Sequence, residues 1–147
     1  MNHIFELEMK VRDYECDVQG VVNNAIYQHY FENARHEYLE TKGASFSALH
    51  DQNIDIMVSR VDISYHHFLR GGDRFVVRLG MKRKGIKLIV QHDLYKLPEE
   101  KLCAKGTVEI ISVENGKLTR GKLFDLLFAD ELKELESQLC GAKNARS

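Results

Sequence analysis

The amino-acid sequence predicts an α+β protein in which an antiparallel sheet of about five strands wraps around one long central helix. Apolar and charged residues alternate with a period of two in several segments, which is the pattern of half-buried strands. One earlier segment instead repeats aromatic residues at spacings of three and four, as a helix with one buried face does. Runs of strands beside a single helix favour a sheet packed on that helix over alternating βαβ units.

The first predicted element is a strand, and a loop follows it. Over residues 5–12, four apolar residues alternate with four charged ones, so one face of this strand is expected to be buried. Residues 13–20 lack this alternation and end in Gln19-Gly20, which is typical of a loop.

A helix is predicted from residue 24 to about residue 41, with Asn23 or Asn24 as its N-cap and Gly43 as its C-cap. Its expected buried face carries Tyr27, Tyr30, Phe31, Ala34 and Tyr38. This aromatic face is wide enough to fill the concave side of a sheet. Residues 45–50 add one short helical turn.

The second half of the chain alternates again and predicts the remaining strands. They are separated by turn signals at Gly71-Gly72, Lys84-Gly85 and Pro98, with Asn115-Gly116 as a hairpin turn. The strands are expected over residues 55–65, 75–82, 87–97 and 102–110. A final amphipathic helix is predicted over 130–139, which leaves a single domain over 1–140 and a disordered tail over 141–147.

Composition narrows the class of protein. The chain has 147 residues and a formal net charge of −1, which argues against bulk electrostatic binding to nucleic acid or to an acidic membrane. No apolar run approaches the roughly 20 residues of a membrane span, and the first residues lack a signal peptide's pattern, so a cytoplasmic location is expected. The three cysteines include no CxxC pair, which fits reduced thiols.

The chemistry-bearing residues lie where the loop meets the helix. Asp17 precedes the helix start by a few residues, so its carboxylate is expected near the free N–H groups of the first turn. Such N–H groups stabilise an oxyanion on a carbonyl, and a nearby carboxylate attacks that carbonyl or activates water. From the residues alone, Asp17 as a helix cap or loop-former is the commoner interpretation.

A longer motif extends this pattern: Asp17-x-x-Gly20-Val-Val-Asn-Asn24-x-x-Tyr27-x-x-Tyr-Phe-Glu-x-Ala-Arg35. It resembles the signature of hotdog-fold acyl-CoA thioesterases of the 4-hydroxybenzoyl-CoA thioesterase and YbgC-like group. Tyr65-x-x-Phe68-x-x-Gly71-x-Asp73 resembles the family's next motif. The resemblance covers roughly residues 4–125.

The resemblance implies hydrolysis of an acyl-CoA thioester to a carboxylic acid and coenzyme A. Asp17 matches the catalytic carboxylate, as nucleophile or as general base, and the backbone N–H of Asn24 matches the group that polarises the carbonyl. Gln19, Gly20 and Tyr27 are assigned to substrate binding, and Gln19 is expected either to narrow the substrate channel or to form a hydrogen bond in it. The carrier is coenzyme A or an acyl carrier protein. No cofactor or metal is implied, and the expected assembly is a homodimer or homotetramer with shared active sites.

A basic turn is the second group of candidate site residues. Its four cations, Lys82, Arg83, Lys84 and Lys87, surround a glycine within six residues. A solvated charge run is the simplest interpretation. In the resembled family, basic residues at this connection hold the nucleotide phosphates of coenzyme A, which is the alternative.

Other interpretations stay open or rank lower. A non-catalytic acyl-CoA sensing module of the same fold is the alternative function, and a hydratase would need a His–carboxylate dyad that the sequence lacks. Cys16 is expected to be a small buried thiol. His66 and His67 are neighbours on a strand and face opposite sides, so a metal pair is disfavoured. Glu32 is expected to pair with Arg35 or with a partner subunit.

Overall fold

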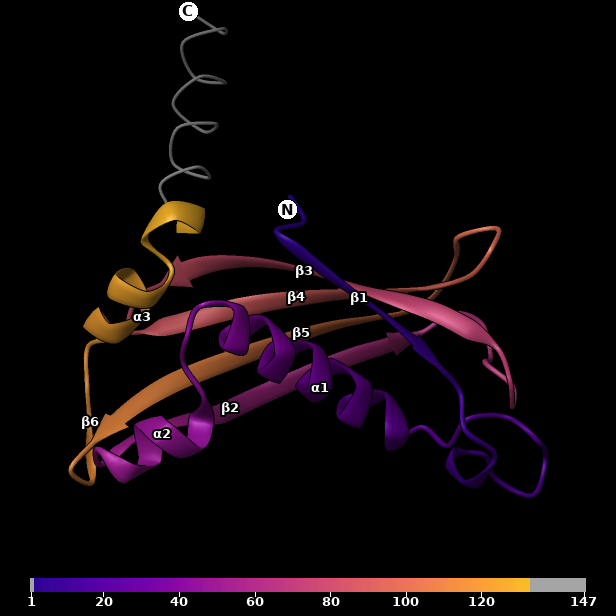
Figure 1. The fold of residues 1–147 in the computed structure, drawn as a ribbon, viewed down its shortest axis with the longest axis horizontal. Coiled ribbons are helices and arrows are strands. Elements are labelled where there is room, and N and C mark those ends of the chain that lie inside the picture. Colours follow the sequence, from indigo (N-terminus) through magenta and orange to yellow (C-terminus); the bar gives the residue numbers. More distant parts are fainter. Residues whose placement is uncertain (1, 133–147) are drawn as a thin grey trace, which may run out of the picture.

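A computed structural model describes residues 2–132 of the chain. Its sheet is antiparallel, with the strand order β1-β3-β4-β5-β2 and with the short β6 paired to β5 (Figure 1). The strands are β1 (Phe5–Lys10), β2 (Ile54–Tyr65), β3 (Arg74–Lys84), β4 (Lys87–Lys96), β5 (Lys101–Glu114) and β6 (Lys117–Leu118). The helices are η1 (Asp13–Glu15), α1 (Ile26–Thr41), α2 (Phe46–Asp51) and α3 (Lys122–Leu127).

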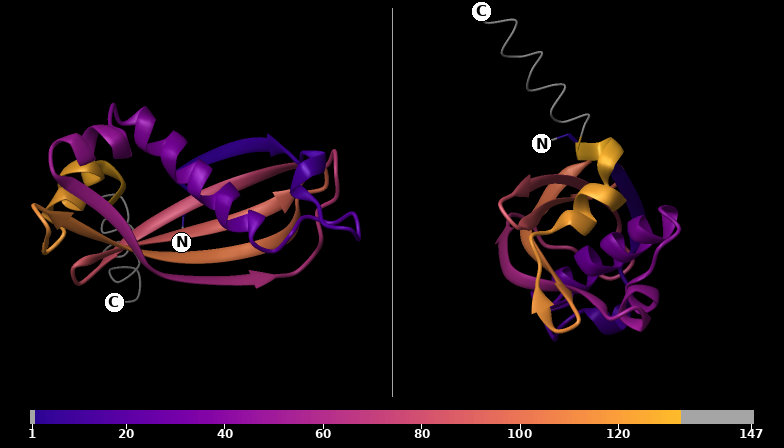
Figure 2. Two further views of the ribbon diagram at one scale, coloured as in Figure 1. Left: turned by 90° about the horizontal axis from the view of Figure 1, so that it is seen from below. Right: turned by 90° about the vertical axis from the view of Figure 1, so that its left-hand side faces the viewer.

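Helix α1 lies along the concave face of the sheet, which curls around it (Figure 2). All five residues of its predicted buried face are buried. The contact is close at Gly106 of β5, where a Cβ would stand 2.4 Å from the ring of Phe31. Only glycine therefore lets the helix approach the middle of the sheet this closely.

Strand β2 forms one edge of the sheet and carries unusual apolar exposure. It pairs with β5 on one side, and no described strand pairs with its other side. Its register shifts between Val58 and Arg60, a bulge that raises the local twist. Met57 and Val58 remain about half exposed on this edge. An open edge with exposed apolar side chains leaves backbone groups and apolar surface available for pairing with another strand.

The predicted architecture is confirmed, with three differences in detail. The loop over 13–20 begins with the short helix η1, and a sixth strand of two residues follows the hairpin turn at Asn115. Helix α3 was not predicted. The helix expected over 130–139 lies mostly outside the described residues, as do the tail and the domain boundary at residue 140. No helix within residues 2–132 is long and apolar enough to cross a membrane.

Candidate active site at the start of helix α1

A small hairpin carries Asp17 toward the start of α1. Its two arms meet in a bridge between Cys16 and Val22, and the Asp17 N–H donates to the Val21 carbonyl over 2.9 Å. Gly20 closes the turn with a φ of +79°, a conformation that glycine adopts without strain. Val22 in turn donates to the Leu69 carbonyl, which ties the hairpin to the loop before β3.

The Asp17 carboxylate is exposed and only partly engaged. Its Oδ1 accepts a 2.8 Å hydrogen bond from the Gln19 N–H, which is the bond of an Asx turn. No hydrogen bond to Oδ2 occurs within residues 2–132. Asp17 thus serves as a loop-former, as the simpler interpretation expected, and still presents one oxygen to solvent. Gln19 lies beside it at the exposed tip of the loop.

The N-cap of α1 is Ala25, so the prediction of a cap at Asn23 or Asn24 is wrong, and Asn23 instead orders the segment just before the helix. Its side-chain Oδ1 accepts from the Ala25 N–H over 3.0 Å, and its carbonyl accepts from the Ile26 N–H over 2.9 Å. The Tyr65 hydroxyl donates to the Asn24 carbonyl over 3.1 Å. These three bonds fix the peptide planes on both sides of Asn24.

The N–H of Asn24 is the donor that this arrangement leaves available. It makes no hydrogen bond in the described part of the chain, and Asn24 is exposed. A fixed, unpaired N–H at a helix start, in the partial positive field of the helix, can donate a hydrogen bond to a developing oxyanion. The site thus combines a donor for a carbonyl oxygen with a carboxylate on the adjoining hairpin.

Tyr27 is the predicted substrate residue that the fold buries. It is 1% exposed, and its ring packs edge-on against Tyr65 with centroids 5.3 Å apart. Its hydroxyl accepts from the Leu69 N–H over 3.4 Å, and burial raises the pKa of that hydroxyl. In this chain Tyr27 belongs to the core and supports Tyr65, so substrate contact finds no support in its position.

Tyr65 is the residue of this site to which the sequence analysis gave no role, although it was part of the second motif. Tyr65 is the last residue of β2, on the face that the alternation turns toward α1. Its hydrogen bond to Asn24 spans 41 residues of sequence. Local patterns do not predict such a contact.

The basic turn lies at the other end of the molecule. Arg83, Lys84 and Lys87 flank the β3–β4 turn, whereas the hairpin carrying Asp17 joins the loop before β3. Since β3 spans 11 residues, these two regions are separated by roughly 30 Å. One chain alone does not bring Asp17 and the basic turn together.

Two of the four cations are engaged within the chain. The guanidinium of Arg83 donates to the Asp125 carboxylate at 2.9 Å and to the carbonyls of Gly85 and Arg120 at 2.9 and 3.0 Å. Lys87 pairs with Glu109 at 3.3 Å. Lys82 and Lys84 are exposed, and their side chains have no hydrogen-bond or ion-pair partner within residues 2–132.

A buried polar pair anchors the middle of α1 to the sheet. Nη1 of Arg35 lies 3.1 Å from Nε2 of His92, and Nδ1 of His92 lies 3.0 Å from the Gly106 carbonyl. Burial and the nearby guanidinium lower the pKa of His92 to about 3. The imidazole is therefore neutral near pH 7, donates from Nδ1 and accepts from Arg35.

The residues that ranked below Asp17 as candidate site residues lie in different environments. Glu32 lies 3.5 Å from His36 and forms no ion pair with Arg35, so the intrachain form of that expectation is wrong. Cys16 is only partly buried, because it lies on the surface hairpin. Within the described part of the chain, no three His, Cys, Asp or Glu side chains are grouped as metal ligands.

A curled antiparallel sheet around one long helix, with a carboxylate hairpin at the helix start, defines a hotdog-fold protein. The family model of the thioesterase-like superfamily matches residues 11–137. The chain belongs to this superfamily.

Several characterised or solved proteins are similar to it. The acyl-acyl carrier protein thioesterase ATL3 of Arabidopsis thaliana is 37% identical over 109 residues, which cover 72% of this chain and 57% of that protein. The chain thus spans little more than half the length of this relative. The acyl-CoA thioesterase YbgC of Haemophilus influenzae is 28% identical over 116 residues, which cover 78% of this chain and 84% of that protein.

The solved structures agree on the fold. A hypothetical protein from Aquifex aeolicus superposes with a TM-score of 0.77 at 28% identity, covering 84% of this chain and 99% of that one. A 1,4-dihydroxy-2-naphthoyl-CoA thioesterase from Synechocystis superposes with a TM-score of 0.79 at 15% identity, covering 86% of this chain and 96% of that one.

Proposed function

We propose that this protein hydrolyses an acyl thioester to a carboxylic acid and a free thiol. The observation that carries the proposal is the fixed, unpaired N–H of Asn24 next to the hairpin that presents the Asp17 carboxylate. Membership of the thioesterase-like superfamily and the similarity to named thioesterases support it.

Two mechanisms fit this arrangement. In the first, an Asp17 oxygen attacks the thioester carbonyl carbon, the C–S bond breaks with loss of the thiolate, and water hydrolyses the mixed anhydride. In the second, Asp17 takes a proton from the water that attacks the carbonyl carbon, and the C–S bond then breaks with loss of the thiolate. In both, the Asn24 N–H donates a hydrogen bond to the carbonyl oxygen and stabilises the negative charge that develops on it.

The proposed working unit contains at least two chains. The open edge of β2 and its exposed apolar residues support pairing with a second β2. Antiparallel pairing would bring the basic turn of one chain toward the Asp17 end of the other. Lys82 and Lys84 could then contact the phosphates of coenzyme A, whereas Arg83 is already committed to Asp125.

The proposal also covers the carrier of the acyl group and the branch of the superfamily to which the chain belongs. Coenzyme A and acyl carrier protein both present the acyl group on a phosphopantetheine thiol, and named relatives are of both kinds. The identity to YbgC supports a place in the 4-hydroxybenzoyl-CoA thioesterase and YbgC-like branch. A cytoplasmic location stays a prediction.

The test is thiol release from a panel of acyl-CoAs and acyl-acyl carrier proteins, with binding measured by calorimetry on the same samples. Turnover of at least one thioester is expected. Tight binding of acyl-CoA without release of thiol from any substrate would contradict hydrolysis and favour the sensing module.

A further inference from the structure

Glu15 lies where the end of β1, the hairpin that carries Asp17 and helix α1 meet. One oxygen of its side chain, Oε1, accepts hydrogen bonds from the Arg12 N–H over 2.7 Å and from the Tyr30 hydroxyl over 3.0 Å. Its backbone carbonyl accepts from the Asn23 N–H over 3.1 Å. A single residue thus joins the strand that precedes the hairpin, the helix that follows it and the segment between hairpin and helix.

Tyr30 attaches this junction to the core. Its ring is 4% exposed and packs against Phe75 of β3 with centroids 4.5 Å apart, and against Tyr27 at 6.1 Å. Burial and the bond to Glu15 raise the pKa of the Tyr30 hydroxyl, so the hydroxyl stays protonated and donates. Glu15 is therefore bonded to a buried residue of α1 rather than to another surface loop.

The two groups proposed to act on the thioester lie close to this junction. Asp17 follows Glu15 by two residues along the chain. The Asn24 N–H belongs to the residue directly after Asn23, whose own N–H binds the Glu15 carbonyl. A shift of Glu15 relative to α1 therefore changes the separation between the Asp17 carboxylate and the Asn24 N–H. A displacement of about 1 Å in a catalytic arrangement can lower a rate about a hundredfold.

The tip of the hairpin has few attachments of its own. Residues 17–20 are exposed. The buried side chain of Val22 holds the second arm, but apolar contacts are non-directional and do not fix an orientation. Among the described residues, the bond from Tyr30 is the one side-chain hydrogen bond by which α1 holds residues 13–23. The orientation of the hairpin on the helix therefore depends on Glu15.

From these contacts we infer that Glu15 is a positioning residue, which through Tyr30 and Asn23 fixes the distance between the Asp17 carboxylate and the Asn24 N–H. The inference rests on the proposed hydrolysis, because it assigns the chemistry to those two groups. Glu15 acts through the residues that it holds and has no contact with substrate in this role. Because both side-chain donors bind the same oxygen, the role requires an acceptor at that place rather than a negative charge.

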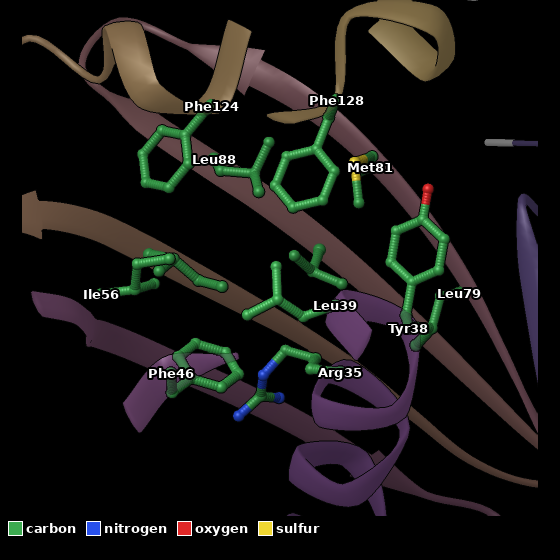
Figure 3. A pocket seen from close by; sticks show the side chains of 12 residues that line it. Arg35, Tyr38, Leu39, Phe46, Ile56, Leu79, Met81, Leu88, Phe124 and Phe128 are labelled. Carbon is green, nitrogen blue, oxygen red and sulfur yellow. The ribbon is translucent and has the colours of Figure 1, made fainter. Parts of the chain in front are cut away.

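Helix α1 offers a matched control at its other end. Tyr38 lies about two turns beyond Tyr30 and is also buried, at 6% exposed. It lines an apolar chamber of about 30 Å³ beneath α3, together with Phe124 and Phe128 (Figure 3). Tyr38→Phe therefore removes the same hydroxyl from the same helix without touching the hairpin.

The test measures kcat and KM for thiol release from butanoyl-, dodecanoyl- and benzoyl-CoA. The variants are Glu15→Ala, Glu15→Gln, Tyr30→Phe, the double variant Glu15→Ala with Tyr30→Phe, and the control Tyr38→Phe. Amide hydrogen exchange of the Asn23 N–H, compared with amides in the middle of β4, reports the attachment of the hairpin separately from catalysis.

Glu15→Ala should lower kcat about ten- to hundredfold with KM changed less than about twofold, because binding groups stay in place while the reacting groups separate. Glu15→Gln keeps an acceptor oxygen and should remain within about threefold of wild type. Tyr30→Phe should lower kcat about three- to tenfold. The double variant should lose no more than Glu15→Ala alone, since both changes break the same bond. Tyr38→Phe should keep wild-type kcat.

Hydrogen exchange gives the second expected result. In Glu15→Ala the Asn23 N–H should exchange at least about tenfold faster than in the wild type, while the amides of β4 keep their wild-type rates. Unchanged β4 rates show that the variant is folded. The faster exchange then reports a local loosening of the segment before α1.

Three results would overturn the inference. The first is an equal loss of kcat in Glu15→Ala and Glu15→Gln, which would assign the effect to the charge. The second is a double variant whose loss equals the product of the two single losses. The third is unchanged exchange of the Asn23 N–H in Glu15→Ala. If this exchange rises as expected and the wild type hydrolyses no thioester, the proposed hydrolysis fails while the attachment of the hairpin through Glu15 stands.

Discussion

The two ends of α1 are built for different tasks. At its start, exposed polar groups are held in place by hydrogen bonds, and the Asn24 N–H and one Asp17 oxygen are left without partners within residues 2–132. At its far end, apolar side chains close over a small chamber, and the Arg83 guanidinium makes several hydrogen bonds. The first end is suited to chemistry and the second to stability.

The comparison also bears on assembly. The basic turn that could hold phosphates belongs to the stable end, roughly 30 Å from Asp17. The basic turn and Asp17 can contact the same substrate molecule only if two chains pair in an antiparallel arrangement. Substitutions at each end should therefore affect different measurements, and the expected effects follow from the largest to the smallest.

Arg83→Ala should cause the largest loss of stability. It removes charge-assisted bonds that join the β3–β4 turn to α3 and leaves Asp125 unpaired, so the free energy of unfolding should fall by about 2 to 3 kcal/mol. Denaturant unfolding of Arg83→Ala beside Lys84→Ala measures this, and Lys84→Ala should stay within about 0.5 kcal/mol of wild type. If Arg83→Ala and Lys84→Ala lowered the free energy of unfolding by the same small amount, a structural role for Arg83 would be contradicted.

His92 should make stability depend on pH. Its pKa is about 3 in the folded chain and 6.5 when unperturbed, so below pH 6.5 the unfolded chain binds the extra proton. The stabilisation is present above pH 6.5 and is lost as the pH falls. From pH 7 to pH 5 the wild type should lose about 2 kcal/mol more than His92→Gln. Parallel pH profiles would show that His92 does not titrate in this way.

Tyr65→Phe should affect turnover more than stability. The ring and its packing on Tyr27 remain, while the bond that fixes Asn24 is lost. A hydrogen bond of this kind corresponds to about a three- to tenfold decrease in kcat, with KM little changed. Tyr14→Phe, which removes a hydroxyl bonded to Arg12, is the matched control and should leave kcat unchanged. An equal decrease in kcat in Tyr65→Phe and Tyr14→Phe would contradict the role of Tyr65 in positioning Asn24.

The smallest effect is expected from Lys82→Ala combined with Lys84→Ala. KM for acyl-CoA should rise about two- to fivefold, because exposed ion pairs contribute little, and the rise should shrink at high salt. KM for an acyl-pantetheine without the nucleotide should not change. The control replaces Lys117 and Lys122 with Ala at the same end. An equal rise in KM for both substrates would contradict phosphate contact.

Much of the fold follows from short-range patterns. The spacing of aromatic residues in α1 and the alternation in the strands report burial directly, so the strands and the buried face of α1 were predicted. Helix α3 was missed because six residues rich in leucine show no periodicity; its position depends on Phe124 in the core and on Asp125 bound to Arg83.

The site was predictable only where local sequence determines it. The motif marked Asp17 and Asn24, whose neighbours on the hairpin and helix fix them. The Tyr65 bond and the engagement of Arg83 join residues about 40 positions apart, and only the folded sheet brings them together. The sequence analysis therefore treated Arg83 and Lys84 alike, although only Lys84 faces solvent.

The account depends most directly on the carboxylate of Asp17. The decisive measurement is kcat for thiol release by Asp17→Asn, with Asp13→Asn as the control for a neighbouring exposed carboxylate. Asp17→Asn keeps an oxygen for the Asx turn, so unfolding should be unchanged while kcat falls at least about a hundredfold. Asp13→Asn should retain wild-type turnover. Wild-type kcat in a folded Asp17→Asn protein would contradict the proposed chemistry.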